Sequence, residues 1–221
     1  MVAWHNLDGA SGCDPEEVDR AIRVVTAFRE VHAYPMLKIR MGVRSFCYSE
    51  HTTAYVTQRL KRVPRIVRKL HRMEHASLAR LEDIGGVRAV VADGTELERV
   101  RTRIGRTWGN AFAREPRDYI ADPKIMGYRA VHIVVQRDGR AVEVQLRTQG
   151  QQQWAEAVEA ADARLNLNLK DGVGPADMME FFEVTGDMIY LREYGFAVPD
   201  DLSARYAAAR AAVVAAGYYS G

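Results

Sequence analysis

The sequence contains few cysteines and no long apolar segment, and each absence excludes a class of protein. Its 221 residues include only Cys13 and Cys47, which lie too far apart to suggest a disulfide framework or a metal-ligand motif. We therefore expect two reduced thiols in a cytoplasmic protein. No apolar run is long enough to span a bilayer, and residues 1–17 lack the basic start and apolar centre of a signal peptide. We accordingly expect no membrane partner.

The charge is balanced over the whole chain but not locally. The net charge is only +2, so the overall charge does not predict a nucleic-acid-binding protein. Between His51 and Met73, however, there is no Asp or Glu. The basic residues of this stretch are Arg59, Lys61, Arg62, Arg65, Arg68, Lys69 and Arg72. A one-sided run of this kind indicates an anionic partner, and a nucleoside triphosphate and a nucleic acid are both candidates.

Hydrophobic periodicity predicts helices at both ends of the chain. Asp14 can cap a helix that has Pro15 at its first position and continues to Tyr34-Pro35. A second helix is expected from Leu37 to Tyr48, and Pro64 is suited to start a third. Later helical patterns cover residues 149–167, 177–194 and 202–216.

The central part of the chain has the pattern of a small sheet. The apolar run Val87–Val91 predicts a buried strand, and Thr95 with Glu98 predicts a capping box at the start of the next helix. Two more strands, residues 128–135 and 141–147, flank a hairpin turn at Asp138-Gly139. These patterns predict an α/β (α+β) fold in which helices flank a small mixed β-sheet. We expect an N-terminal helical extension over residues 1–54, a core over 55–170 and C-terminal helices over 171–221.

Polar residues alternate with apolar ones along the last expected strand. Glu143, Gln145 and Arg147 share one face of this strand, opposite an apolar face. A carboxylate in the middle of a strand is unfavourable unless that face lines a site. Asp83 precedes the double glycine at the start of an earlier strand, and Mg²⁺ binds through one or two carboxylates together with phosphate oxygens. Asp83 and Glu143 are therefore the candidate metal ligands, whereas His132 and Trp154, taken alone, are better interpreted as structural.

Five polar segments follow one another in an order that resembles the RelA/SpoT synthetase domain. They are Arg59-x-Lys61, Ile66-x-x-Lys69-x-x-Arg72, Asp83-Ile84-x-Gly86-x-Arg88, Asp118-Tyr119-Ile120-x-x-Pro123-Lys124-x-x-Gly127-Tyr128-Arg129-x-x-His132 and Glu143-x-Gln145-x-Arg147-Thr148. The resemblance covers residues 55–161 and is closest to the small, single-domain alarmone synthetases. It implies a nucleotidyltransferase-like synthetase fold and an ATP-dependent pyrophosphotransferase.

The resemblance also implies a role for each matched residue. Arg59 and Arg88 would sandwich the adenine of ATP, and the ATP phosphates would be held by Lys61, Lys69 and Arg72. Asp83 and Glu143 would hold Mg²⁺ and act in catalysis, with Glu143 accepting the proton of the attacking 3′-hydroxyl. The acceptor would be bound by Lys124, Tyr128, Arg129, His132, Gln145 and Arg147, with Tyr128 stacking on its base. A site of basic residues and carboxylates suits phosphoryl chemistry, which depends on positioning and charge neutralisation.

Three departures from the family pattern leave the acceptor open. Met126 stands where the family usually has Asn, Ala130 where it often has Ser, and Val158-Glu159 where it commonly has Glu-His. The first hypothesis is transfer to GDP or GTP, which makes (p)ppGpp and AMP. The second is a toxic relative that modifies the 3′ end of tRNA or makes (p)ppApp and is neutralised by an antitoxin protein. The third is a non-catalytic nucleotide-binding regulator. No His-Asp pair occurs, so we expect no hydrolase half, and homo-oligomer formation is left open.

Overall fold

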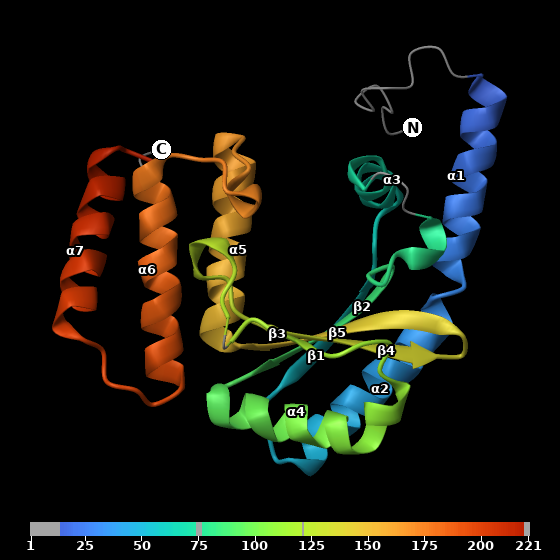
Figure 1. Cartoon of the computed structure of the whole chain (residues 1–221), viewed down its shortest axis with the longest axis horizontal. Coiled ribbons are helices and arrows are strands. Elements are labelled where there is room, and N and C mark those ends of the chain that lie inside the picture. The colour runs from blue at the N-terminus through green and yellow to red at the C-terminus, as the bar shows by residue number, and fades with distance from the viewer. Residues whose placement is uncertain (1–13, 74–76, 121, 219–221) are drawn as a thin grey trace.

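A five-stranded mixed sheet forms the centre of the computed structural model, which describes residues 14–73, 77–120 and 122–218 (Figure 1). Cys13 lies outside these residues. The strand order is β1-β2-β5-β4-β3, with β2 and β5 parallel and the other neighbours antiparallel. The strands are β1 (Tyr55–Leu60), β2 (Gly85–Val91), β3 (Arg117–Asp118), β4 (Val131–Arg137) and β5 (Arg140–Thr148). The predicted fold class, a small mixed sheet flanked by helices, is confirmed.

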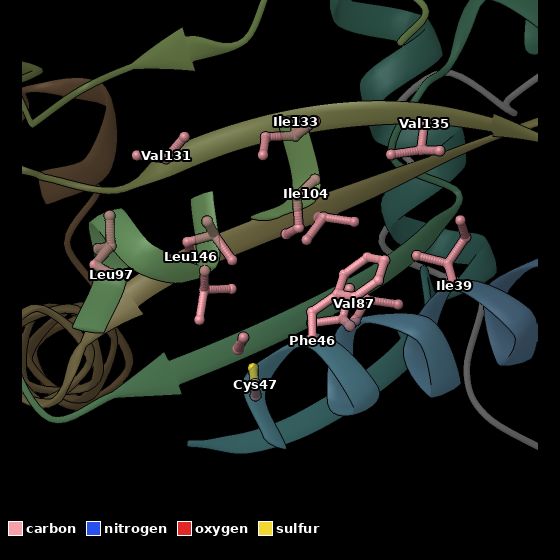
Figure 2. Close-up of a cluster of buried hydrophobic side chains, with 14 of the residues drawn as sticks. Ile39, Phe46, Cys47, Val87, Leu97, Ile104, Val131, Ile133, Val135 and Leu146 are labelled. Carbon is pink, nitrogen blue, oxygen red and sulfur yellow. The ribbon is translucent and has the colours of Figure 1, made fainter. Parts of the chain in front are cut away.

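Two helices, α2 (Ala33–Ser49) and α4 (Gly94–Trp108), cover one face of the sheet (Figure 1). Figure 2 shows the main core on this side, where Ile39 and Phe46 of α2 lie beneath the apolar side chains of the strands. Leu97 and Ile104 of α4 complete this core, and each is fully buried. The apolar residues that alternate along β5 thus face α2 and α4, which leaves the polar residues of β5 on the other face.

The other helices lie at the two ends of the opposite face. Figure 1 shows α1 (Pro15–Glu30) and α3 (Val63–Arg72) at one end, and α5 (Gln149–Leu165), α6 (Ala176–Glu193) and α7 (Asp200–Ala215) at the other. Short 3₁₀ turns connect the elements at Leu78–Arg80 (η1), Gly109–Ala111 (η2), Ile125–Gly127 (η3) and Leu169–Asp171 (η4). Trp154 of α5 is buried and donates from Nε1 to the carbonyl of Phe182, 2.8 Å away. Its predicted structural role is confirmed.

Two local predictions are also confirmed. Asp14 caps α1, because its Oδ1 accepts from the backbone N–H of Glu16 at 3.1 Å. The hairpin between β4 and β5 has positive φ angles of 51° at Asp138 and 72° at Gly139. Positive φ at both central residues is the property of a type I′ turn, which matches the twist of the flanking strands.

Two predicted helix starts are wrong. The cap of α4 is Asp93 and not Thr95: Asp93 Oδ1 accepts from the N–H of Glu96 at 2.9 Å, and Glu96 in turn accepts from the N–H of Ala92 at 3.0 Å. The cap therefore forms two residues earlier, and Glu96 accepts from the residue before the cap and not from the cap itself. Helix α2 begins at Ala33 and includes Pro35, which belongs to the first turn, where the backbone N–H groups have no intrahelical acceptor.

The first strand was not predicted, and β4 begins at Val131, three residues later than expected. Strand β1 is an edge strand with mostly exposed side chains, so its sequence lacks a clear apolar face. The antiparallel pairing of these residues with β2 is what makes them a strand. Among the helices of the described residues, none has the length and apolar character needed to cross a membrane.

Candidate active site

The strand register gathers polar side chains on the face of the sheet opposite α2 and α4. Glu143 of β5 lies beside Gly86 of β2 and Val134 of β4, and Gln145 lies beside Arg88 and His132. Arg59 of β1 lies beside Gly86. We call this set the polar face; its members are Arg59, Arg88, His132, Glu143, Gln145 and Arg147.

Both carboxylate oxygens of Glu143 are held by neighbours on the polar face. His132 Nδ1 lies 2.9 Å from Oε1, and Gln145 donates from Nε2 to Oε2 at 2.7 Å. Burial alone would raise the pKa of Glu143, but the contacts with His132 and Gln145 outweigh it and leave the pKa below its usual value. Only 15% of the Glu143 side chain is exposed. The polar face therefore presents an ionised carboxylate in a fixed orientation.

Asp83 lies just before β2 and is bound by two lysines. Lys61, which follows β1, and Lys69 of α3 both contact its Oδ2, the latter at 2.9 Å. Burial would raise the pKa of Asp83, but these two contacts lower it overall. Oδ1 of Asp83 is buried and has no hydrogen-bond partner among the described residues. Asp83 thus keeps an unused acceptor.

Asp83 and Glu143 belong to one electrostatic neighbourhood, since the charge of Asp83 works to raise the pKa of Glu143. Within the described ranges, no cluster of three or more His, Cys, Asp or Glu side chains is arranged to hold a metal. Mg²⁺ needs no such cluster, because it binds through one or two carboxylates and completes its shell with phosphates and water. The free Oδ1 of Asp83 and the nearby Glu143 carboxylate fit this donor set.

The two predicted adenine-binding arginines lie near each other on β1 and β2. Arg88 donates from Nε and Nη2 to Gln145 Oε1 at 3.4 Å. Its pKa is lowered mainly by burial and further by the charges of Arg147 and Arg59. Arg59 is exposed at the sheet edge. The two guanidinium groups are therefore close together, and the charges of both work to lower the pKa of Glu159 of α5.

Arg72 differs from the other predicted ATP ligands. It lies at the end of α3, 68% of its side chain is exposed, and its Nη1 is 3.6 Å from Asp171 Oδ1 in η4. Lys61 and Lys69 converge on Asp83, whereas Arg72 reaches toward η4. The structure therefore brings together four of the five predicted ATP-binding residues and leaves Arg72 at the rim.

Several predicted acceptor ligands surround Tyr128. Its hydroxyl lies 2.7 Å from His132 Nε2 and accepts from Arg147 Nη2 at 2.8 Å. Lys124 Nζ lies over the ring of Tyr119 at 4.1 Å and is 5.7 Å from the centre of the Tyr128 ring. These contacts place Lys124, Tyr128, His132 and Arg147 in one group with Glu143 and Gln145.

Arg129 is directed elsewhere. Its Nη2 donates to Asp187 Oδ1 of α6 at 2.8 Å, its Nη1 donates to the carbonyl of Ile120, and its guanidinium lies over Tyr190 at 4.2 Å. Only 9% of the side chain is exposed. In this structure Arg129 joins the segment before β4 to α6 and does not lie among the other acceptor residues.

Two of the departures from the family pattern are buried positions. Ala130 has no exposed surface, and Met126 is 3% exposed in an apolar cluster with Trp154 and Phe182. Met126 also has a φ of 60°, a conformation that Asn adopts more readily than most residues. Neither side chain belongs to the polar face.

Two residues near the polar face were not among the predicted site residues. Gln152 of α5 accepts from Arg147 Nη1 at 3.0 Å, and Glu159 works to raise the pKa of Arg88. Gln152 stands in a run of glutamines, and the sequence gives no sign of which one faces the sheet. Glu159 departs from the family pattern, and this departure is the sequence feature that could have indicated its place near the site.

Part of the chain matches a known family of proteins. Residues 58–166 match the model of the region found in RelA/SpoT proteins. This part of the chain is therefore a RelA/SpoT region. Its relatives include uncharacterized proteins of Mycobacterium tuberculosis and Mycobacterium bovis, each 33% identical over 159 residues, which are 67% of this chain and 56% of the relative. A GTP pyrophosphokinase of Haemophilus influenzae is 34% identical over 106 residues, 47% of this chain and 14% of that protein. The chain thus spans little more than half the length of its mycobacterial relatives.

Solved structures share the fold. The small alarmone synthetase 1 of Bacillus subtilis, bound to its product pppGpp, has a TM-score of 0.62 and 20% identity, over 79% of this chain and 93% of that one. The small alarmone synthetase 2 of the same organism has a TM-score of 0.58 and 21% identity, over 80% and 94%. At these identities the likeness shows that this chain and the two synthetases share a fold.

Proposed function

We propose that this chain transfers the β,γ-diphosphate of ATP to the 3′-hydroxyl of a guanine nucleotide, which yields AMP and (p)ppGpp. The observation that carries the proposal is the ionised carboxylate of Glu143, held by His132 and Gln145 beside Asp83. The membership of residues 58–166 in the RelA/SpoT family supports this class of reaction.

The donor would lie between β1, β2 and α3. Arg59 and Arg88 present two guanidinium groups, whose planar shape suits stacking on adenine. Lys61 and Lys69 would exchange their shared contact with Asp83 for the phosphates of ATP. Arg72 would have to turn from Asp171 to reach them.

Asp83 and Glu143 would hold Mg²⁺, Asp83 through the buried Oδ1 that no described group contacts. When bound, the ion neutralises negative charge on the phosphates during transfer. Because the ion would bind at Oδ1, Lys61 and Lys69 could leave Oδ2 for the phosphates without leaving the charge of Asp83 unpaired.

Glu143 would accept the proton of the acceptor hydroxyl. The 3′-oxygen then bonds to the β-phosphorus of ATP, the bond from that phosphorus to the oxygen bridging to the α-phosphorus breaks, and AMP leaves with that oxygen. Such a transfer needs no protein nucleophile, because the enzyme contributes positioning and electrostatic stabilisation.

A guanine acceptor is favoured by two observations. Relatives and neighbours are described as a GTP pyrophosphokinase and as a synthetase bound to pppGpp. The changes at Met126 and Ala130 fall on buried side chains that are not members of the polar face.

The test is an acceptor survey with purified protein, Mg²⁺ and ATP labelled at the γ-phosphate. GDP, GTP, ADP and deacylated tRNA are offered separately, and the labelled products are separated by chromatography and gel electrophoresis. Label on GDP or GTP is the expected result. Label on ADP or tRNA would show that this molecule, and not a guanine nucleotide, is the acceptor, and would favour the hypothesis of a toxic relative. Transfer to none of the four would favour a non-catalytic regulator.

A further inference from the structure

A chain of hydrogen bonds connects four side chains and ends on Glu143. Arg147 Nη2 donates to the Tyr128 hydroxyl at 2.8 Å, that hydroxyl lies 2.7 Å from His132 Nε2, and His132 Nδ1 lies 2.9 Å from Glu143 Oε1. We call Arg147, Tyr128, His132 and Glu143 the donor chain. It starts and ends on β5 and passes through the segment before β4 and through β4 itself.

The chemistry of its two ends gives the donor chain a direction. A guanidinium can only donate hydrogen bonds, and an ionised carboxylate can only accept them. The Tyr128 hydroxyl therefore accepts from Arg147, and His132 Nδ1 donates to the carboxylate of Glu143. His132 Nε2 lies against the Tyr128 hydroxyl, so both ring nitrogens are held. These two contacts fix the orientation of the imidazole beside the carboxylate.

The donor chain is buried and anchored at its far end. Arg147 is 6% exposed and also donates from Nη1 to Gln152 Oε1 of α5 at 3.0 Å, and His132 is 8% exposed. Gln152 in turn donates to Glu156 Oε1 at 2.6 Å. Hydrogen bonds in such a low-dielectric setting polarise one another, so the loss of one link weakens the next.

We propose that His132 and the hydroxyl of Tyr128 are positioning residues that orient Glu143, rather than ligands of the acceptor. This inference rests on the proposed function, in which Glu143 accepts the proton. Gln145 already holds Oε2 of the carboxylate at 2.7 Å, so His132 supplies the second constraint that fixes its plane. The ring and the hydroxyl of Tyr128 thus have different roles, and the substitution Tyr128→Phe removes only the hydroxyl.

The first test is Tyr128→Phe, measured by steady-state kinetics with ATP, Mg²⁺ and GDP. The phenyl ring keeps the apolar surface, and only the hydroxyl that fixes His132 is lost. We expect kcat to fall about two- to tenfold, the range of one hydrogen bond, while KM for GDP stays the same. Tyr119→Phe is the matched control, because its ring lies 5.2 Å from that of His132 but its hydroxyl is outside the donor chain. We expect Tyr119→Phe to leave kcat unchanged.

The second test compares His132→Asn with His132→Ala. An Asn amide reaches about as far as Nδ1 and can still donate to Glu143, but it cannot reach Tyr128. We expect His132→Asn to keep more of the wild-type kcat than His132→Ala, which leaves the buried carboxylate short of a donor. In the His132→Asn background, Tyr128→Phe should cause no further loss, because the link it removes is already broken.

Three results would overturn the positioning role. They are a Tyr128→Phe protein with unchanged kcat, a rise in KM for GDP without a change in kcat, and losses that multiply in the double variant. Melting temperatures of all variants show whether a change in activity comes from unfolding of the protein. A folded wild-type protein that transfers to no acceptor would overturn the proposed function and this inference with it, whereas the three results above leave the proposed function intact.

Discussion

Replacement of Asp83 by Asn removes the negative charge that Lys61 and Lys69 share and changes the side-chain volume very little. Both ammonium groups contact Oδ2, and the three side chains are between 23% and 26% exposed. A hydrogen bond to a charged group contributes about 1.5–3 kcal/mol and a neutral one about 1 kcal/mol, so each contact loses about 1 kcal/mol. We expect the free energy of unfolding to fall by about 2 kcal/mol, and the melting temperature by about 4–8 °C for a chain of this size.

The assay is urea unfolding of the ligand-free protein at pH 7.5, followed by circular dichroism. Asp138→Asn is the matched control, since it removes the carboxylate of an exposed ion pair with Lys38 at 2.9 Å. Asn also tolerates the positive φ of position 138, so the control adds no backbone strain. We expect no measurable change in that variant.

Equal stability of Asp83→Asn and the wild type would refute this reasoning, because the two lysine contacts would then contribute nothing. The same proteins also test the donor site. Mg²⁺ with a non-hydrolysable ATP analogue should raise the melting temperature of the wild type and raise that of Asp83→Asn much less. An equal rise in both would place the nucleotide away from Asp83.

Three further substitutions test separate parts of the structure. Glu143→Gln should lower transfer at least about a hundredfold while circular dichroism stays unchanged, because it removes the proton acceptor; retained transfer would exclude Glu143 from the chemistry. Glu193 accepts from the Gly150 N–H and the Thr148 hydroxyl, and burial raises its pKa, so the native state keeps this proton to a higher pH than the unfolded state. The stability that Glu193 contributes should therefore be lost as the pH rises above about 4.3 toward its raised folded pKa, so the stability of the wild type relative to Glu193→Gln should fall over that range; parallel curves would contradict this. Ile133→Ala should lower the free energy of unfolding by about 2–5 kcal/mol in urea, because Ile133 is 1% exposed in the main core; a loss below about 1 kcal/mol would mean that the sheet is loosely packed on α4.

The sequence predicted the elements whose pattern is set locally. Alternation along β5 placed Glu143 and Gln145 on one face, and the Asp-Gly turn fixed the hairpin that pairs them with β4. Strand β1 escaped prediction because an edge strand buries little, so its sequence is under weak constraint to alternate. Its existence depends on pairing with β2, which is distant in the sequence.

Side-chain direction was the part of the site that sequence could not supply. The motif around Tyr128 includes Arg129 and His132 on equal terms, yet Arg129 turns to Asp187 of α6 and His132 turns to Glu143. Asp187 lies 58 residues from Arg129, in a helix with no motif of its own. Such a contact is set by the packing of α6 against η3 and α5, and no local sequence pattern predicts it.

Three of the basic side chains on the ATP side lie near carboxylates in the ligand-free protein, which affects binding. Lys61 and Lys69 are engaged with Asp83, and Arg72 lies near Asp171. A triphosphate that binds without a metal would take the lysines and leave the partly buried charge of Asp83 unpaired beside the negative phosphates, which is costly. A metal that binds without phosphates would be repelled by the two ammonium groups at Asp83. When the metal and the triphosphate bind together, neither cost applies, because the phosphates replace Asp83 as partners of the lysines while the metal pairs with Asp83. The same contacts that stabilise the empty site thus favour binding of the nucleotide and the cation as one unit.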